Sequence, residues 1–464
     1  MPHLSRKITH SGSTQARRQI PAICCAFMTF ALMFAAPPST SFAQVLTSDI
    51  ILGASADARG IDADELPDIS SPHAMVLSQD GTAYYERSAD EAIKVASVTK
   101  VMTALVALEN CNLLDTVTVD HTAATVGESS LGLLEGDTLT MEDALTGLMV
   151  MSGNDAATAI AIAAGSKIDP TTNDPYATFI KAMNDKASEL GCTNTVFENP
   201  HGLDFDAWAG DLHSTTRDIT TVYAAAMKNE DFRAIDNSDR TSITVTSADG
   251  SSRALPLTVR NQIQGQDGNI GGKTGTTFEA GNCFVGAFAR ENGGEVYVAV
   301  FGAQDNDARF ADTLALANWY YSHIAEVPII NTPVVRNGVP LVGEAACSAW
   351  CDRTAAVTIK DPKTTFSVFS LGGELEQTIS YDELNGAVEQ GATVGSISFQ
   401  QQDATVAQAE LVAAESVAAP NPLEWLLVQF DRLVRRFKGE PLTAETLTLN
   451  EAPNVLKLDA WGAA

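Results

Sequence analysis

The stretch IKVASVTKVM, residues 93–102, places Ser97 three residues before Lys100 at the predicted start of a helix. Residues three apart lie on the same face of a helix, so this hydroxyl and this amine are neighbours. A serine hydroxyl is a weak nucleophile that needs an adjacent base. The helix N-terminus and burial both disfavour an ammonium ion, and both lower the pKa of a lysine there. Ser97 and Lys100 are therefore a candidate nucleophile and base, although a serine at a helix start is also a common N-cap.

The segment MSGND, residues 151–155, interrupts two apolar helical patterns at 141–151 and 155–165. The hydroxyl of Ser152 is suited to relay a proton to a leaving amine. The amide of Asn154 is suited to hold both Lys100 and a substrate carbonyl. Because Ser, Gly and Asn are also common turn residues, an ordinary interhelical turn is the alternative interpretation.

A third segment, GGKTGTT at residues 271–277, is predicted to be a strand. Lys273 and Thr274 would suit binding of an anionic substrate end, and Gly275 leaves room for a ligand backbone. A phosphate-binding loop is excluded because position 267 is Asp instead of Gly and because strands follow, not a helix. The three segments are separated by 55 and 121 residues and in this order are the signatures of penicillin-interacting acyl-serine enzymes.

The surrounding patterns predict an α/β domain built on a largely antiparallel sheet. Asp80-Gly81 marks a hairpin within residues 74–86, and a helix is expected over residues 97–110. Thr215 and Asp218 form a predicted capping box at the start of a further helix. The remaining expected elements are strands at 269–277, 282–290 and 295–304 and a helix at 310–324.

The chain after residue 328 has a different character. Short alternating segments predict a small all-β domain over residues 330–418, and a helix at 422–439 precedes a polar tail at 440–464. The helix has one broad apolar face and a basic cluster, formed by Arg432, Arg435, Arg436 and Lys438. Such a helix can lie in the headgroup region of an anionic membrane, or it can pack on the β-domain.

Residues 1–43 have the order of a secretory signal peptide: a basic region, an apolar run at 20–36 and small residues before a cleavage point after Ala43. An uncleaved membrane anchor is the alternative. Without this segment the chain keeps 25 basic and 58 acidic residues, a net charge of −33. A surface this acidic repels nucleic acid, so no nucleic-acid partner is expected.

The cysteines and histidines give no sign of a metal site, because neither a CxxC nor an HExxH motif occurs. We therefore expect no metal and no cofactor. Cys347 and Cys351 are close enough for a disulfide in an oxidising compartment. Cys111, Cys192 and Cys283 have the pattern of isolated core residues.

Five longer segments extend the motif match: IKVASVTKVMTALVALE, LTGLMVMSGNDAATAIA, NTVFENPHGLD, HSTTRD and GGKTGTTFEAGNCFVGAFAR. Together they closely resemble the serine D-Ala-D-Ala carboxypeptidases, the low-molecular-mass penicillin-binding proteins. The resemblance covers residues 50–325, and residues 330–418 look like the second domain that many of these proteins carry. It implies a β-lactamase/transpeptidase-like fold and the peptidoglycan stem peptide and β-lactam antibiotics as partners.

The resemblance also implies roles for individual residues. Ser97 would be acylated by the penultimate D-alanine, Lys100 would be the base, and Ser152 with Asn154 would form the second wall. The remaining implied contacts are Lys273, Thr274 and Gly275 on the third wall, the N–H groups of Ser97 and Thr276 as an oxyanion hole, and Arg309 for the substrate carboxylate. His201 also matches a family segment, and we expect it to be structural.

Three other functions remain open from the sequence. A class A β-lactamase would need a glutamate for deacylation, for which Glu198 is the nearest candidate. A D,D-endopeptidase acting on cross-links would use the same residues. A wall-binding scaffold with an inactive site would need no base. We expect an extracytoplasmic enzyme, peripheral on the outer face of the cytoplasmic membrane.

Overall fold

The computed structural model describes residues 49–455 of the 464-residue chain. The predicted signal peptide at 1–43 and the last nine residues of the predicted polar tail lie outside the described residues.

A seven-stranded antiparallel sheet forms the centre of residues 50–322, in agreement with the largely antiparallel sheet that the sequence predicts. The strand order is β2-β1-β4-β3-β11-β10-β9. The predicted hairpin at Asp80-Gly81 is confirmed, because β3 and β4 pair on either side of it. The strands are β1 (Ile50–Ile51), β2 (Ala54–Ser55), β3 (His73–Ser78), β4 (Ala83–Arg87), β9 (Asn269–Thr277), β10 (Gly281–Arg290) and β11 (Gly294–Ala303).

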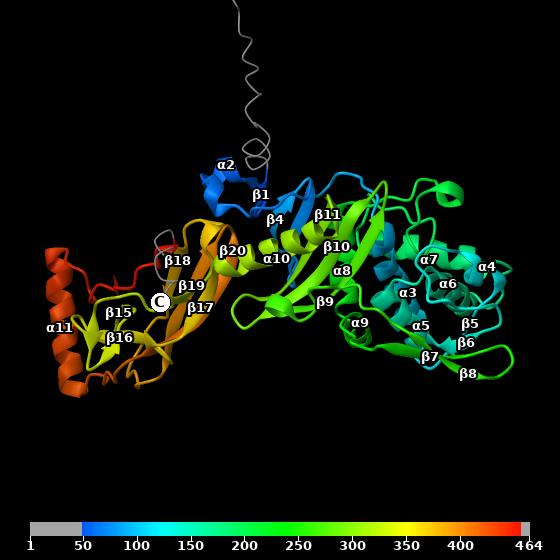
Figure 1. Ribbon diagram of the computed structural model, residues 1–464. Helices are drawn as coiled ribbons and strands as arrows, with labels where there is room; N and C mark the ends of the chain where they lie inside the picture. The colour runs from blue at the N-terminus through cyan, green and yellow to red at the C-terminus, as the bar shows by residue number, and fades with distance from the viewer. Residues whose placement is uncertain (1–48, 456–464) are drawn as a thin grey trace, which may run out of the picture. The chain divides into compact units, whose positions relative to one another are not determined.

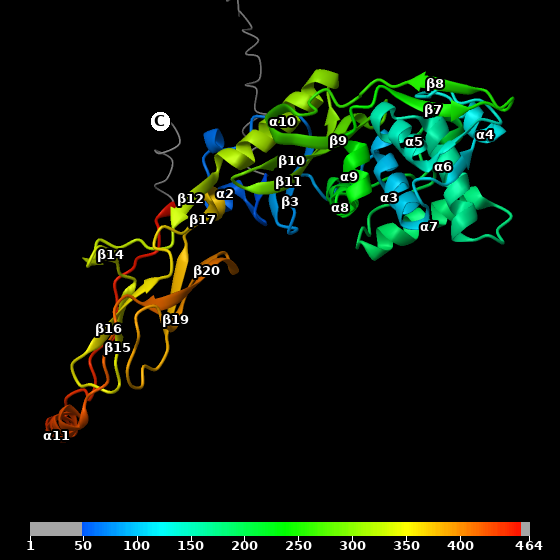
Figure 2. The same ribbon diagram turned by 90° about the horizontal axis from the view of Figure 1, so that it is seen from below.

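Helices cover both faces of this sheet, because alternate residues of its central strands point to opposite sides. On β3, Met75 and Leu77 belong to the hydrophobic core on the face that most of the helices cover. Ala74 and Val76 belong to the core on the opposite face, which α10 (Asn306–Ser322) covers (Figures 1 and 2). The helices are α2 (Ala56–Arg59), α3 (Lys100–Asn110), α4 (His121–Thr125), α5 (Met141–Thr146), α6 (Asn154–Ile168), α7 (Pro175–Glu189), α8 (Thr216–Ala226), α9 (Glu230–Asp236) and α10 (Asn306–Ser322).

A second, four-stranded sheet was not predicted. It has the order β5-β6-β7-β8 and joins segments more than 100 residues apart in the chain. Its strands are β5 (Thr116–Thr118), β6 (Thr138–Thr140), β7 (Ser242–Thr246) and β8 (Ser252–Pro256).

The predicted β-rich region is confirmed. Its six-stranded sheet has the order β18-β19-β20-β16-β15-β21, and β12 pairs with β17 and β13 with β14. The strands are β12 (Ile324–Pro328), β13 (Val335–Arg336), β14 (Val339–Pro340), β15 (Gly343–Ala346), β16 (Thr354–Ile359), β17 (Thr365–Phe369), β18 (Glu376–Tyr381), β19 (Thr393–Gln401), β20 (Ala404–Ala413) and β21 (Leu447–Thr448).

The C-terminal helix α11 (Pro422–Lys438) matches the predicted segment. It begins with a capping box between Asn421 and Glu424 and ends at Gly439 in the left-handed conformation. The chain then returns to the sheet, where β21 pairs with β15. None of the helices found in residues 49–455 combines the length and the apolar character needed to cross a bilayer.

Three local expectations differ from the structure. Thr215 caps α8, but Asp218 accepts hydrogen bonds from Asn194 N and Thr195 Oγ1 and does not complete the capping box. The helix predicted at 310–324 begins at Asn306, because Asp305 supplies an N-cap. The disulfide that the spacing of Cys347 and Cys351 allows is not formed, since both are free thiols and Cys351 Sγ faces Val428 O at 3.8 Å.

Candidate active site

Ser97 lies in a single 3₁₀ turn, Ala96–Thr99, that leads directly into α3. Ala96 has a φ of +48°, which turns the chain sharply before the serine. The hydroxyl of Ser97 does not cap α3. Instead, its Oγ accepts a hydrogen bond of 2.8 Å from Lys100 Nζ, which removes the alternative that Ser97 is an ordinary N-cap.

Lys100 is fully buried, and its Nζ has three neighbours. It donates to Ser97 Oγ, to Asn154 Oδ1 at 2.7 Å and to the carbonyl oxygen of His201 at 3.0 Å. Burial, and secondarily the positive charge of Lys273, lower the pKa of Lys100 well below its usual value, while Asp155 opposes this effect. The structure therefore brings a deprotonatable amine against the predicted nucleophile.

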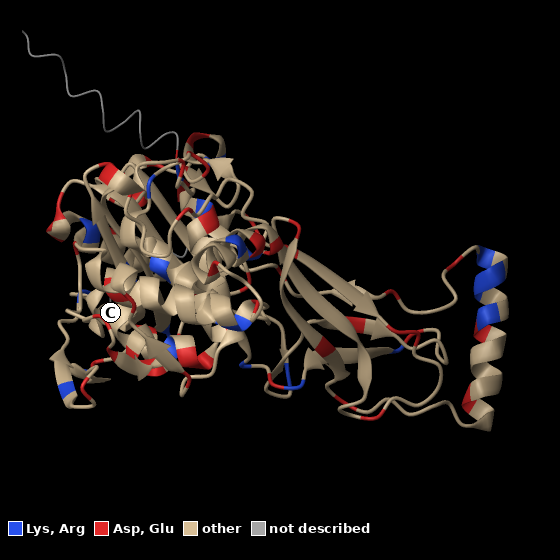
Figure 3. Cartoon of the chain, turned by 90° about the vertical axis from the view of Figure 1, so that its right-hand side faces the viewer, with Lys and Arg blue, Asp and Glu red and all other residues tan. Residues whose placement is uncertain are grey.

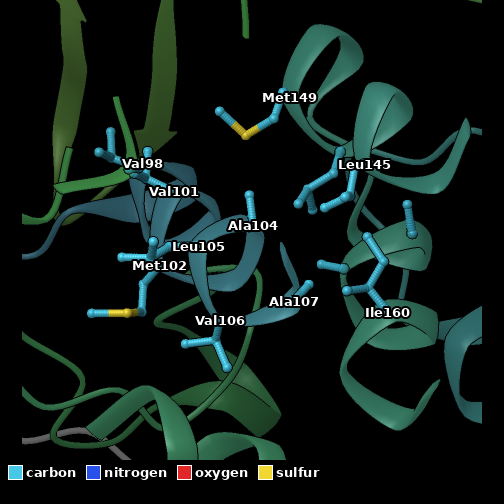
Figure 4. Packing of buried hydrophobic residues seen from close by; sticks show 14 of the residues in the cluster. Val98, Val101, Met102, Ala104, Leu105, Val106, Ala107, Leu145, Met149 and Ile160 are labelled. Carbon is cyan, nitrogen blue, oxygen red and sulfur yellow. The ribbon is translucent and has the colours of Figure 1, made fainter. Parts of the chain in front are cut away.

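The helix that carries Lys100 is held by apolar packing. Figure 4 shows Ala104 and Ala107 of α3 on the side of the helix that faces Leu145 and Ile160 of the neighbouring helices. Ala104 and Ala107 are small enough for this close approach. Since α5 precedes Ser152 in the chain and α6 begins at Asn154, one hydrophobic core positions two of the three predicted segments.

Ser152 and Asn154 occupy the break between helices that the sequence indicates. One π-helical turn, Gly147–Met151, ends at Ser152, whose φ of +66° lies in the left-handed region. A residue other than glycine rarely adopts this conformation, which is typical of functional sites. Asn154 begins α6, and its Nδ2 donates to Gly127 O at 3.0 Å, so its Oδ1 is directed at Lys100.

Asp155 is a supporting residue that the sequence motifs do not indicate. Its buried carboxylate accepts hydrogen bonds from the backbone N–H groups of Leu131, Gly132 and Leu133 and from Ser130 Oγ. These bonds fasten the loop beside Ser152 to the start of α6. A carboxylate directly after serine-glycine-asparagine is the only sequence signal for this role, and the sequence does not show which N–H groups it binds.

Lys273 joins the third segment to the second. It is fully buried on β9, and its Nζ donates to Ser152 Oγ at 2.9 Å and to Thr274 O at 2.7 Å. Burial lowers the pKa of Lys273 to about 7, against the opposing influence of Asp236. Two lysine–serine pairs, Lys100–Ser97 and Lys273–Ser152, thus lie in one site.

Gly275 lies where β9 passes the turn that carries Ser97. A Cβ at this position would lie 2.8 Å from Val95 O and 3.2 Å from both Ala96 Cβ and Ser97 N. The sequence predicts that this small residue leaves space for a ligand. The structure adds a stronger reason, because the backbone of the Ser97 turn already occupies that space.

Arg309 on α10 reaches the same strand. Its Nη1 donates to Gly275 O and to Thr276 Oγ1, each at 3.0 Å, and its Nη2 contacts Asn306 Oδ1. Its buried Nε has no hydrogen-bond partner among the described residues. The structure therefore brings Arg309 to the predicted site beside Thr276, whose side chain is exposed.

His201 and Glu198 take the positions of supporting residues. The ring of His201 is buried, and burial lowers its pKa to about 2, so it carries no charge. Its carbonyl oxygen is the group that contacts Lys100. Glu198 is exposed and accepts a hydrogen bond from Leu212 N. Neither side chain has the partners of an acid or base.

Three comparisons place the chain among known proteins. The D-alanyl-D-alanine carboxypeptidase family, peptidase S11, matches residues 61–305. The D-alanyl-D-alanine carboxypeptidase of Streptomyces sp. strain K15 is 32% identical over 252 residues, which are 52% of this chain and 84% of that protein. DacF of Bacillus subtilis strain 168, named as the same activity, is 26% identical over 361 residues, 74% of this chain and 85% of that protein.

The crystal structure of the Streptomyces K15 DD-transpeptidase has 32% sequence identity and a TM-score of 0.51, covering 55% of this chain and 97% of the other. The family match spans more than half of the 464 residues and includes all three segments that the structure brings together. The chain is therefore a member of the D-alanyl-D-alanine carboxypeptidase family of serine peptidases.

Proposed function

We propose that this serine D-alanyl-D-alanine carboxypeptidase acts through Ser97 as its nucleophile and Lys100 as the base. The observation that carries the proposal is the 2.8 Å contact between Lys100 Nζ and Ser97 Oγ, made by an amine whose pKa burial lowers. A neutral amine at this distance can take the hydroxyl proton while Oγ attacks the carbonyl carbon of the penultimate D-alanine.

Ser152 is assigned to the leaving group. As the tetrahedral intermediate collapses, the C–N bond breaks and the released D-alanine nitrogen needs a proton. The Ser152 hydroxyl can give up its proton and recover one from Lys273, which lies 2.9 Å away. Water then cleaves the acyl-serine ester: Lys100 returns its proton to Ser97 Oγ, and the proton that the attacking water loses restores Lys273, so that both lysines regain their starting forms as the shortened stem peptide is released.

The anionic end of the substrate is assigned to β9. Lys273, Thr274 and Arg309 offer positive charge and a hydroxyl, and Gly275 with Thr276 lies beside the turn of Ser97. Charge-assisted hydrogen bonds to a carboxylate are among the strongest available in proteins. The N–H groups of Ser97 and Thr276 are assigned to the developing oxyanion.

The experiment is an intact-mass measurement of residues 44–464 after incubation with benzylpenicillin, with Ser97→Ala beside the wild type. One ligand mass on the wild type alone, lost slowly, supports the acyl-serine carboxypeptidase. Rapid clearance of the adduct with penicillin turnover would support a β-lactamase instead. A folded wild-type protein that neither forms an adduct nor turns over penicillin would support a scaffold with an inactive site.

We further propose that residues 1–43 are a signal peptide and that the mature enzyme is held on the outer face of the cytoplasmic membrane by α11. The helix packs on the β-domain through Val428, while its apolar face points away from that contact. Six large side chains on this face are between 51% and 84% exposed: Leu423, Leu426, Leu427, Phe430, Leu433 and Phe437. An exposed apolar face of this size supports a membrane partner over packing on the protein.

The acidic surface supports the absence of a nucleic-acid partner.

A further inference from the structure

The return of the chain after α11 creates a cavity beside the helix. The cavity measures about 530 Å³ and lies between one flank of α11 and residues 442–443. Its lining combines two guanidinium groups, three polar side chains and two leucines: Arg432, Arg436, Ser348, Gln429, Thr443, Leu433 and Leu442. We refer to it as the flank pocket.

The positive charge of the flank pocket is unbalanced. The neighbouring Arg435 pairs with Asp431 at 2.8 Å. Within residues 49–455, no carboxylate lies within 4 Å of the guanidinium nitrogens of Arg432 or Arg436. Arg432 donates to Ser348 O, yet its buried Nε has no partner in the described part of the chain. In a chain with 58 acidic and 29 basic residues, two unpaired arginines on one pocket indicate an external anion. Figure 3 shows the basic residues, in blue, gathered toward one end of α11.

The second wall of the flank pocket is fixed before any ligand arrives. Arg435 Nη1 donates to Pro441 O at 3.3 Å, and Ala346 N donates to Thr446 Oγ1 at 3.1 Å. The pairing of β21 with β15 then holds the following residues on the sheet. Leu442 and Thr443 are therefore tethered on both sides, and the pocket is built into the fold.

The position of the pocket on the helix suits a lipid. At about 100° per residue, Gln429, Arg432 and Arg436 lie on a flank between the face packed on the β-domain and the exposed apolar face. When the apolar face lies in the acyl boundary, this flank is at the level of the headgroups. A phosphate there meets guanidinium and hydroxyl donors, and the glycerol and upper acyl carbons meet Leu433 and Leu442.

We propose that the flank pocket binds the phosphate of an anionic phospholipid, so that α11 recognises a headgroup in addition to inserting its apolar face. This proposal rests on the membrane association proposed above. It differs from general attraction between basic helices and anionic membranes because it requires particular residues on one flank, including the uncharged Thr443.

The test compares binding of residues 44–464 to vesicles of phosphatidylglycerol mixed with phosphatidylcholine and to vesicles of phosphatidylcholine alone. Arg436→Gln is matched by Lys438→Gln, which removes the same charge two residues away on the opposite flank. Loss of one basic charge near an anionic surface weakens binding about fivefold. We expect Lys438→Gln to show that loss, Arg436→Gln to lose at least tenfold, and the neutral change Thr443→Val to lose about threefold. All should retain penicillin acylation.

Equal losses of vesicle affinity for Arg436→Gln and Lys438→Gln, with no effect of Thr443→Val, would overturn phosphate binding by the flank pocket. Membrane association itself would remain supported. No binding of the wild type to either vesicle would overturn membrane association itself. In a further measurement, the lipid-free and the vesicle-bound protein are titrated with inorganic phosphate. Millimolar phosphate that binds the lipid-free protein and releases it from vesicles would assign the site to a free anion and would also overturn the lipid assignment.

Discussion

The amine of Lys100 contacts three different elements, and in its neutral form it has two N–H groups for the oxygens of Asn154 and His201 and a lone pair for the hydroxyl of Ser97. Its partners lie on the 3₁₀ turn, at the start of α6 and in the loop that carries His201. Each contact fixes the amine relative to one part of the site, and none is a carboxylate that would stabilise the ammonium form. Geometry and pKa at this residue therefore favour the same function.

Lys100→Ala should lower the rate of acylation by benzylpenicillin about 10³-fold, within the usual range for removal of a general base. The fold should persist, because α3 is held by its apolar core. Stopped-flow or mass-based acylation rates beside circular dichroism spectra would measure both. Lys94→Ala is the control, since its ammonium contacts only Gly210 O and Leu212 O among the described residues. Normal acylation by Lys100→Ala would contradict the assignment of the base.

The carboxylate of Asp236 influences the pKa of Lys273. Burial raises the pKa of Asp236 to about 6, so its carboxylate is charged at pH 7, and this charge raises the pKa of Lys273. Asp236→Asn removes the charge, and the pKa of Lys273 falls further below about 7. If the ammonium binds the substrate carboxylate, the alkaline limb of kcat/KM for a D-alanyl-D-alanine peptide must then move to lower pH.

The pH profile of the Asp236→Asn variant would test this, with an expected loss of several-fold at pH 8, since one pKa unit corresponds to about tenfold. Asp231→Asn, on the exposed side of the same helix, should leave the profile unchanged. An alkaline limb that does not move, or that moves upward, would show that Asp236 has no influence on Lys273.

At the scale of elements, the site depends on the close approach of β9 to the turn before α3. Strand and turn touch at Gly275, where no side chain fits. Gly275→Ala should separate the two elements by several tenths of an ångström and move Ser97 N away from the position of the oxyanion. Because small misplacements of reacting groups are costly, we expect acylation to slow about 100-fold. A thermal unfolding midpoint measured in parallel separates this effect from general destabilisation, and an unimpaired rate in a folded variant would refute it.

The sequence predicts the elements of the site better than their contacts. The strands β9 to β11 and the helices α3 and α6 carry clear periodicities, and three motifs indicate Ser97, Ser152 and Lys273. The sheet β5–β8 is not predicted from the sequence. Its two inner strands, β6 and β7, are only 3 and 5 residues long, and more than 100 residues of chain separate them. The π turn before Ser152 and the four hydrogen-bond donors that residues 130–133 direct at Asp155 depend on tertiary packing, which no local pattern encodes.

At the scale of the whole molecule, residues 440–455 are part of the β-domain. Asn450 is buried, accepts a hydrogen bond from Asn331 N, and donates to Ile329 O and Gln377 Oε1. The sequence identifies this region as a polar tail because a buried asparagine and a two-residue strand have no local signature. The strand forms only where β15 supplies its partner.

Asn450→Ala should lower the free energy of unfolding of the β-domain by about 2–3 kcal/mol, since three hydrogen bonds are lost and buried partners are left unsatisfied. Penicillin acylation should be unaffected. Chemical denaturation followed by tryptophan fluorescence would report the change, because Trp350 lies in the core of this domain. Gln408→Ala, at an exposed position of β20, is the control with an expected effect below about 0.5 kcal/mol. Equal stabilities of the two variants would exclude a structural role for Asn450.

The return of the chain after α11 also determines how a variant that lacks this helix should be engineered. A stop codon before Pro422 would remove the amphipathic helix, but it would delete the sixth strand and Asn450 as well. Excising only residues 422–438 and rejoining the chain would keep both. The 17 residues of the helix span about 25 Å, so the replacement needs about eight residues in extended conformation. The helix can thus be removed while the strand and the asparagine that follow it in the chain are kept.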